Sequence, residues 1–287
     1  MDPDMQKAQV DDIEIAYWRV GRGAPLVVVH GGPGIGHRYL RPLDVWTEEG
    51  YELIYYDQRG SGHTELGDPD KVSFSGAIAD LDGLRAVLGI EKLNLVGHSF
   101  GADLAVMYAA KRPEHAASLV VINPGPPFVP ELMESFQQTM GARRSLQDDE
   151  EKKAIENSAG FASGDPATLE RSVLNSYTPF FSDRSHRDAC DLGFTQVTAA
   201  NVGKAPERMF RDLADLDPIG SLSDIACPTL VVYSENDPLP EEFSRLLADK
   251  IASAEYQYLS GASHFVFYEN PAAIVASVMP FLRAFAH

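Results

Sequence analysis

A serine flanked by glycines, at the junction of a predicted strand and a predicted helix, constrains this chain more than any other stretch. Residues 93–96 are mostly apolar and typical of a short buried strand, and residues 102–110 are typical of a helix. Between them stands Gly97-His98-Ser99-Phe100-Gly101. Glycines are needed there because side chains would collide with the neighbouring strand and helix. We therefore expect Ser99 to stand clear of a sheet at a helix N-terminus, where the partial positive charge favours a developing oxyanion.

Buried-strand patterns recur along the chain and alternate with helical patterns. Strands are predicted at residues 5–10, 13–20, 26–30, 51–56, 93–96, 119–122, 229–233 and 254–259. The first two form a hairpin, and the later apolar runs are typical of parallel strands that are buried on both faces. A final helix is predicted to have Asn270 as its N-cap and Pro271 at its first position. This order predicts an α/β fold with a mostly parallel, doubly wound sheet, in which ligands bind beyond the carboxyl ends of the strands.

One long segment interrupts the alternation of strands and helices. Residues 127–217 lack strand runs rich in Val and Ile, and helices are plausible at 130–140 and 167–175. We expect a helical cap at 127–217, inserted between the two parts of the core, residues 1–126 and 218–287. The charged run at 147–153 is interpreted as solvent-exposed surface.

The amino-acid composition excludes several classes of function. At 287 residues and 44 % hydrophobic, the chain can bury a large core. Its net charge of −18 argues against nucleic acids and anionic membranes as partners, since phosphate binding needs clustered Lys and Arg. The negative charge is interpreted as promoting solubility; alternatively, it produces an electric field that attracts cationic substrates.

The two cysteines, Cys190 and Cys227, give no disulfide framework and no metal-ligand spacing, so we expect a protein without metal or other cofactor. The first residues lack a signal-peptide pattern, which favours a cytoplasmic protein.

A serine hydroxyl needs a base to take its proton, and the base needs an acid partner to fix its tautomer. Asp237 follows one late predicted strand and His264 follows the next, so both fall on the rim where Ser99 is expected. The chain order Ser, Asp, His is that of the α/β-hydrolase fold. Asp217 and Asp224 are rival acids, but neither ends a strand. We therefore predict a catalytic triad of Ser99, Asp237 and His264.

The oxyanion of such a reaction needs two preorganised donors. The amide of Phe100 is supplied by the turn that holds the serine, and the second donor is expected from the loop His30-Gly31-Gly32-Pro33-Gly34. Gly32 is the best candidate because a glycine lets the backbone approach a substrate closely. For His30 we expect a structural role, with hydrogen bonds within the loop.

Several motifs together resemble the α/β-hydrolase superfamily, and in particular its proline iminopeptidase group. They are His30-Gly31-Gly32-Pro33-Gly34, Asp57-Gln58-Arg59-Gly60-Ser61-Gly62, the Gly-x-Ser-x-Gly stretch at 97–101, Asp237 and His264. The resemblance covers nearly the whole chain outside the predicted cap. It implies removal of an N-terminal residue, preferentially proline, from small peptides through an acyl-enzyme. It also implies that cap carboxylates bind the free α-amino group of the peptide.

The resemblance implies that Glu207 is the residue that binds the substrate amine, with Glu131 and Glu134 as weaker candidates for the same role. Gly31 is a further candidate substrate contact. Two alternatives stay open. The first alternative is an esterase, lactonase or carbon–carbon bond hydrolase that acts on a small metabolite. It is suggested by the stretch Gly97-His98-Ser99-Phe100-Gly101, a version common in esterases and carbon–carbon bond hydrolases. The second alternative is a non-catalytic ligand receptor with the same fold.

Overall fold

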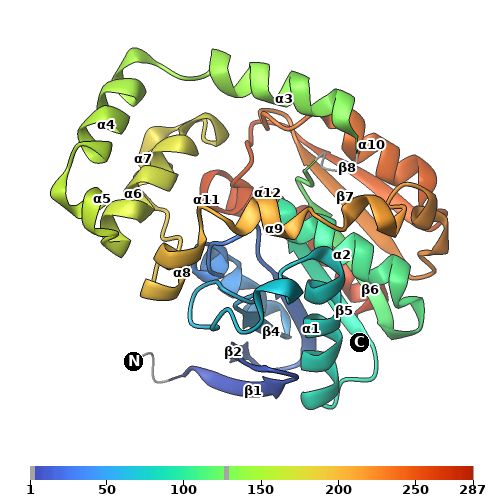
Figure 1. Cartoon of the computed structure of the whole chain (residues 1–287). Coiled ribbons are helices and arrows are strands. Elements are labelled where there is room, and N and C mark those ends of the chain that lie inside the picture. The colour runs from blue at the N-terminus through green and yellow to red at the C-terminus, as the bar shows by residue number, and fades with distance from the viewer. Residues whose placement is uncertain (1–3, 126–128, 287) are drawn as a thin grey trace.

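The computed structural model describes residues 4–125 and 129–286, and it is built around one sheet of eight strands in the order β1-β2-β4-β3-β5-β6-β7-β8 (Figure 1). The strands are β1 (Gln6–Val10), β2 (Ile13–Gly21), β3 (Ala24–Val29), β4 (Tyr51–Tyr56), β5 (Leu93–His98), β6 (Ala116–Ile122), β7 (Thr229–Ser234) and β8 (Ala254–Leu259). The pairs β1–β2 and β2–β4 are antiparallel, and every other neighbouring pair is parallel. Each predicted strand is confirmed, with its ends shifted by at most three residues.

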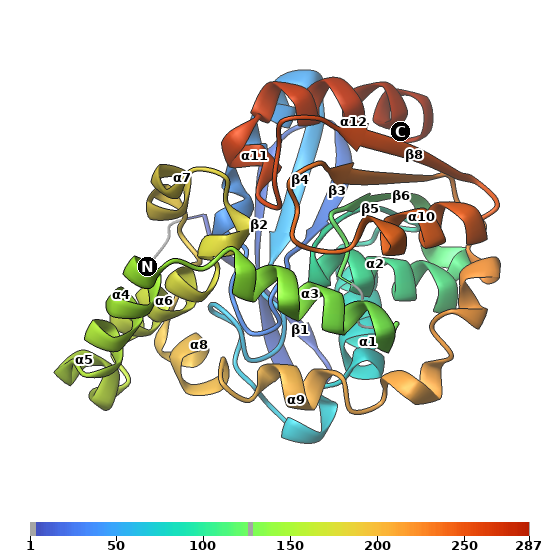
Figure 2. The same ribbon diagram turned by 90° about the horizontal axis from the view of Figure 1, so that it is seen from above.

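Helices cover both faces of the sheet, and Figure 2 shows α12 on one side with α1 and α2 on the other. The core helices are η1 (Arg38–Glu49), α1 (Phe74–Val87), α2 (Phe100–Lys111), α10 (Glu241–Lys250), α11 (Val266–Glu269) and α12 (Pro271–Phe285). Side chains alternate between the faces along β3: Val27 and Val29 pack with α1 and α2, whereas Leu26 and Val28 pack with η1 and α12. Burial on both faces explains why this strand is an uninterrupted apolar run.

The predicted start of the last helix is confirmed, whereas three core helices, η1, α10 and the four-residue α11, were not anticipated. Asn270 precedes α12 and its side chain accepts a hydrogen bond from the Ala273 amide at 3.2 Å, with Pro271 at the first helical position. The 3₁₀ helix η1 buries Tyr39, Leu40, Leu43 and Trp46 at helical spacing, but Pro42 in its interior disfavours a helix there. The amphipathic helix α10 is only ten residues long.

A helical insertion lies between β6 and β7, and we use this term for residues 130–216. Its helices are α3 (Pro130–Ala142), α4 (Leu146–Glu156), α5 (Ala159–Ser163), α6 (Pro166–Ser176), η4 (Thr178–Phe180), α7 (Arg184–Ala189), α8 (Gln196–Asn201), α9 (Ala205–Met209) and η5 (Leu213–Leu216). Figure 1 shows α4, α5, α6 and α7 grouped at one side of the molecule, with α3 running from this group toward α10. The predicted start of the cap, residue 127, lies outside the described residues.

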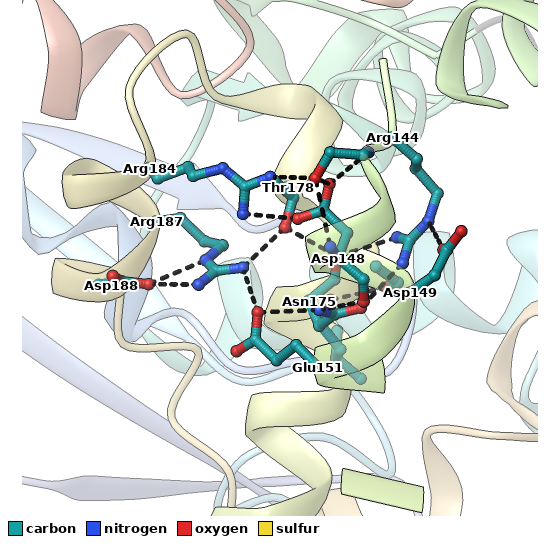
Figure 3. Close-up of polar contacts among 12 residues, drawn as sticks. Arg144, Asp148, Asp149, Glu151, Asn175, Thr178, Arg184, Arg187 and Asp188 are labelled. Atoms are coloured by element: carbon teal, nitrogen blue, oxygen red, sulfur yellow. Dashed lines mark hydrogen bonds and ion pairs between the residues drawn. The ribbon is translucent and has the colours of Figure 1, made fainter. Parts of the chain in front are cut away.

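The charged run at 147–153 is not simply solvated surface, which corrects one expectation from the sequence. Asp148 is fully buried and pairs with Arg184 at 2.6 Å, while its backbone carbonyl accepts a hydrogen bond from Asn175 at 3.0 Å (Figure 3). Arg187 contacts Glu151 at 3.0 Å in the same cluster. These contacts join α4, α6 and α7. The spacing of the charges along the sequence does not show that they face one another.

Candidate active site

Ser99 occupies the turn between β5 and α2 that the sequence predicted. All residues of β5 are buried at the middle of the sheet, between β3 and β6. Ser99 has a φ of +55°, a conformation that non-glycine residues adopt rarely, and its amide donates to the Ile122 carbonyl at 3.0 Å. A Cβ on Gly97 would lie 2.5 Å from the Ala102 Cα, and one on Gly101 would lie 2.1 Å from the Val29 oxygen. The two glycines are therefore required by the close approach of strand and helix.

Asp237 and His264 follow β7 and β8 and form a buried pair. The Nδ1 atom of His264 lies 2.7 Å from Oδ2 of Asp237, and Oδ1 of Asp237 accepts a hydrogen bond from the Leu239 amide at 2.8 Å. Because Nδ1 carries the hydrogen that is donated to the carboxylate in this hydrogen bond, Nε2 of His264 keeps its lone pair and can act as a base. The rival acids lie elsewhere, Asp217 before η6 (Gly220–Asp224) and Asp224 exposed at its end.

The loop at residues 30–34 presents a backbone amide to the same region. Nδ1 of His30 lies 2.8 Å from the Gly31 carbonyl oxygen, and Nε2 accepts from the Gln58 amide at 3.0 Å, so His30 has the structural role expected of it. Burial lowers the pKa of His30 to about 4, which keeps the ring neutral. The Gly31 amide donates to the Tyr39 hydroxyl at 2.6 Å, whereas within the described residues the Gly32 amide donates to no protein group. The Gly32 amide is therefore free for a ligand.

The Asp57-Gln58-Arg59 motif supports this loop and does not enter the cavity. Asp57 accepts hydrogen bonds from the backbone amide of His37 at 3.0 Å and that of His63 at 2.8 Å, while Arg59 forms a two-pronged contact with Asp80 at 2.9 and 2.8 Å. Burial raises the pKa of Asp57, but the neighbouring His37 and the hydrogen bonds more than offset this effect, so the pKa lies well below its usual range. The motif thus fixes the rim through a buried anion.

A hydrogen-bonded chain that sequence reasoning missed joins the loop, the serine turn and the histidine. Nδ1 of His98 lies 3.0 Å from the Tyr39 hydroxyl, and Nε2 lies 2.9 Å from the His264 carbonyl oxygen. Burial raises the pKa of Tyr39 and lowers that of His98, so Tyr39 donates to Nδ1 and the neutral His98 donates from Nε2. Asn123 also donates to the His264 carbonyl, at 2.9 Å. The position of His98 inside the Gly-x-Ser-x-Gly stretch was the only signal in the sequence.

These groups open onto one cavity of about 350 Å³ between the core and the helical insertion. Core residues in its wall include Gly31, Gly32, Ser99, Phe100, Leu239 and His264. The insertion contributes Met133, Phe136, Met140, Ser176, Tyr177, Phe180 and Phe210. The predicted oxyanion donors therefore lie in the same cavity as Ser99 and His264. Such an arrangement can support attack by a serine on an acyl carbon.

The predicted amine-binding glutamates are not brought to this cavity. Glu207 is exposed on α9 and is not part of the cavity wall. Glu131 and Glu134 are exposed on α3, whose Met133, Phe136 and Met140 face the cavity instead. A different acid, Asp103 on α2, belongs to the wall, and sequence reasoning missed it because it resembles an ordinary helical residue.

Within the described residues, no group of three or more His, Cys, Asp or Glu side chains is placed to hold a metal ion. None of the described helices is both long and apolar enough to cross a membrane.

Comparison with known proteins places these features in a family. A family model described as the alpha/beta hydrolase fold matches residues 24–271. The proline iminopeptidase of Levilactobacillus brevis is 28 % identical over 274 residues, which cover 91 % of this chain and 88 % of that protein. A crystal structure of a proline iminopeptidase-related protein from Thermus thermophilus has a TM-score of 0.71 at 25 % identity and covers 100 % of this chain and 99 % of its own. An enol-lactonase from Burkholderia xenovorans has a TM-score of 0.66 at 21 % identity, covers 97 % of this chain and 100 % of its own, and shows the shared fold alone.

Proposed function

Because the chain belongs to the α/β-hydrolase family and is a hydrolase, we propose that it is a serine aminopeptidase of the proline iminopeptidase type. It would release an N-terminal residue, preferentially proline, from small peptides. The observation that carries the proposal is the His264–Asp237 pair at 2.7 Å, whose histidine lines the same cavity as Ser99. The curated relatives named proline iminopeptidase, which this chain matches over most of its length, support the substrate class.

In the proposed reaction, the Ser99 hydroxyl attacks the carbonyl carbon of the N-terminal residue while Nε2 of His264 takes its proton. Asp237 orients His264 and stabilises the imidazolium. The amides of Gly32 and Phe100 hold the oxyanion, and the N-terminus of α2 adds its partial positive charge. His264 then gives the proton to the leaving amine, and an acyl-enzyme remains on Ser99. A water molecule that His264 deprotonates hydrolyses this ester and frees the residue.

The shape of the cavity supports a small substrate. Its volume of about 350 Å³ is at the lower end of the range for ligand sites, roughly 300–1,000 Å³. The insertion contributes one side of the wall. A cavity of this size, walled on one side by the insertion, suits the end of a short peptide better than the middle of a protein chain.

A second candidate is hydrolysis of an uncharged ester, a lactone or a carbon–carbon bond. The apolar wall favours it, with Met133, Phe136, Met140 and Phe180 among the lining residues, and so does the exposed position of Glu207 away from the cavity.

A paired assay separates the candidates. Wild type and Ser99→Ala are each given prolyl p-nitroanilide, which has a free amine, and p-nitrophenyl butyrate, which has none. The proposal expects release of p-nitroaniline by wild type and its loss in Ser99→Ala. Cleavage of the ester alone would replace the aminopeptidase with the second candidate. Activity on both substrates that survives Ser99→Ala would remove Ser99 from the mechanism.

A further inference from the structure

Asp103 is a buried carboxylate in the cavity wall that the proposed mechanism does not use. The residue is 1 % exposed and lines the cavity together with Ser99, Phe100 and Phe210. Among the described residues, its Oδ1 atom has no hydrogen-bond partner. Asp103 is the only Asp, Glu, Lys or Arg in the described part of this wall.

The surroundings of Asp103 disfavour the charged form of its carboxyl group. Burial raises the pKa of the carboxyl well above its usual range, and only a hydrogen bond from the Gly125 amide acts against this effect. No cationic side chain contributes to the balance. Folded proteins rarely bury such a group without a partner, because desolvation of a carboxylate is costly. An acid retained in an apolar wall therefore points to a partner that arrives with the ligand.

The position of Asp103 relative to Ser99 is set by the helix. Ser99 precedes the first turn of α2, and the Asp103 amide donates to the Ser99 carbonyl at 3.3 Å, the spacing of one helical turn. The Cα–Cβ bonds of helical residues tilt toward the helix N-terminus, and Asp103 and Ser99 both line the cavity. The carboxyl group is therefore directed toward the end of the helix where Ser99 stands.

The aromatic wall beside Asp103 also suits a cation. Phe100 and Phe210 both line the cavity and lie edge to face, with their ring centres 5.9 Å apart. Faces of aromatic rings attract ammonium groups, most strongly where water is excluded. The net charge of −18 also produces a long-range electric field that attracts cations.

We propose that Asp103 is the specificity-determining residue of this cavity and binds the ammonium group of the substrate's N-terminal residue. This inference rests on the proposed aminopeptidase function and assigns to α2 of the core the role that the family resemblance gave to a cap glutamate. The ammonium N–H group donates to Oδ1, the oxygen that lacks a partner. If the carboxyl group is protonated in the empty cavity, a neutral amine takes its proton and forms the same ion pair.

The test is direct binding to the Ser99→Ala protein, which does not depend on turnover. Calorimetry compares prolinamide, which carries the ammonium group, with cyclopentanecarboxamide, which has the same ring shape and no charge. We expect prolinamide to bind at least about 10-fold more tightly, and Asp103→Asn in the same background to remove most of this preference. Glu134→Gln, which removes one exposed charge from α3, and Glu207→Gln serve as matched controls that keep the preference.

Three results would overturn the assignment: equal binding of the two ligands to Ser99→Ala, a preference that survives Asp103→Asn, or a preference lost in Glu207→Gln. The first of these needs no variant at Asp103, so the assignment can fail even if Asp103→Asn does not fold. Failure of the proposed function has a different signature. In that case wild type cleaves no prolyl anilide, whether or not prolinamide is preferred by the Ser99→Ala protein.

Discussion

The rim of the core, by which we mean residues 30–34, 97–101, Asp237 and His264, and the helical insertion form two walls of one cavity. Different kinds of contact fix these two regions in place. The groups of the rim follow strand ends and are fixed by hydrogen bonds to the backbone. For example, Nε2 of His98 lies 2.9 Å from the carbonyl oxygen of His264. The insertion is held by charged pairs between short helices, such as Asp148 with Arg184 at 2.6 Å. The groups proposed for the chemistry are therefore positioned by the sheet, whereas the other wall of the cavity is positioned by the packing of short helices on one another.

The first prediction concerns the acid of the rim. Asp237→Asn is expected to lower kcat by about 10⁴-fold, because an amide favours the wrong tautomer of His264. The measurement is steady-state turnover of whichever substrate the paired assay identifies. Asp224→Asn removes an exposed acid from η6 and is the matched control, expected to retain full activity. Equal losses in the two variants would contradict the assignment of Asp237.

The residues of the rim could be predicted from the sequence because strand ends are local features. Ser99 and Asp237 follow apolar runs, His264 follows the last predicted strand, and parallel strands bring their carboxyl ends to one edge. Asp103 could not be found this way, since its importance arises from burial beside residues such as Phe210, which come from the insertion. Glu207 was placed by family resemblance, and its short helix α9 leaves it exposed. The contacts among helices of the insertion depend on packing that no periodicity encodes.

The second prediction compares a glycine of the rim with one of the insertion. Gly32 has a φ of +124°, and a Cβ there would lie 2.9 Å from the Gly34 nitrogen. Gly32→Ala should therefore displace the free amide and lower kcat by about 10²–10³-fold. Gly141, in α3, has nothing within 4 Å of an added Cβ. Gly141→Ala should keep activity and stabilise the fold by about 0.5–1 kcal/mol, measured by thermal unfolding. Unchanged kcat in Gly32→Ala would remove its amide from the oxyanion site.

The third prediction is that acid weakens the rim before the insertion. The pKa of His30 falls from 6.5 to about 4 on folding, so between these values the unfolded chain binds more protons and stability declines as the pH is lowered. The contribution lost is about 3 kcal/mol once the pH is below 4. Asp148 behaves differently: its pKa is lowered below 3.8, so its contribution is lost only in stronger acid.

Urea unfolding of wild type and His30→Asn, at pH 7.5 and pH 4.5, measures this effect. The free energy of unfolding should fall more between the two pH values in wild type than in the variant, since the difference between them isolates His30. The same fall in both proteins would show that His30 does not carry the effect.

The last of these predictions concerns the charged contacts of the insertion. Asp148→Asn removes a buried ion pair and should cost about 1–3 kcal/mol. Hydrogen exchange should increase in α4, α6 and α7, while exchange in β5 stays unchanged. Asp149→Asn is the control, because Asp149 is exposed and its contact with Arg144 contributes about 0–1 kcal/mol. Faster exchange throughout the sheet would show that the two regions unfold together.

Covalent labelling asks whether Ser99 is a nucleophile activated by His264. A fluorophosphonate probe is added to the folded protein, and the adduct is located by mass spectrometry of the intact chain and its peptides. We predict one adduct per chain, on Ser99, absent in Ser99→Ala and formed far more slowly in His264→Ala. A folded protein that takes no label would favour a ligand receptor, and a label on another residue would identify a different nucleophile.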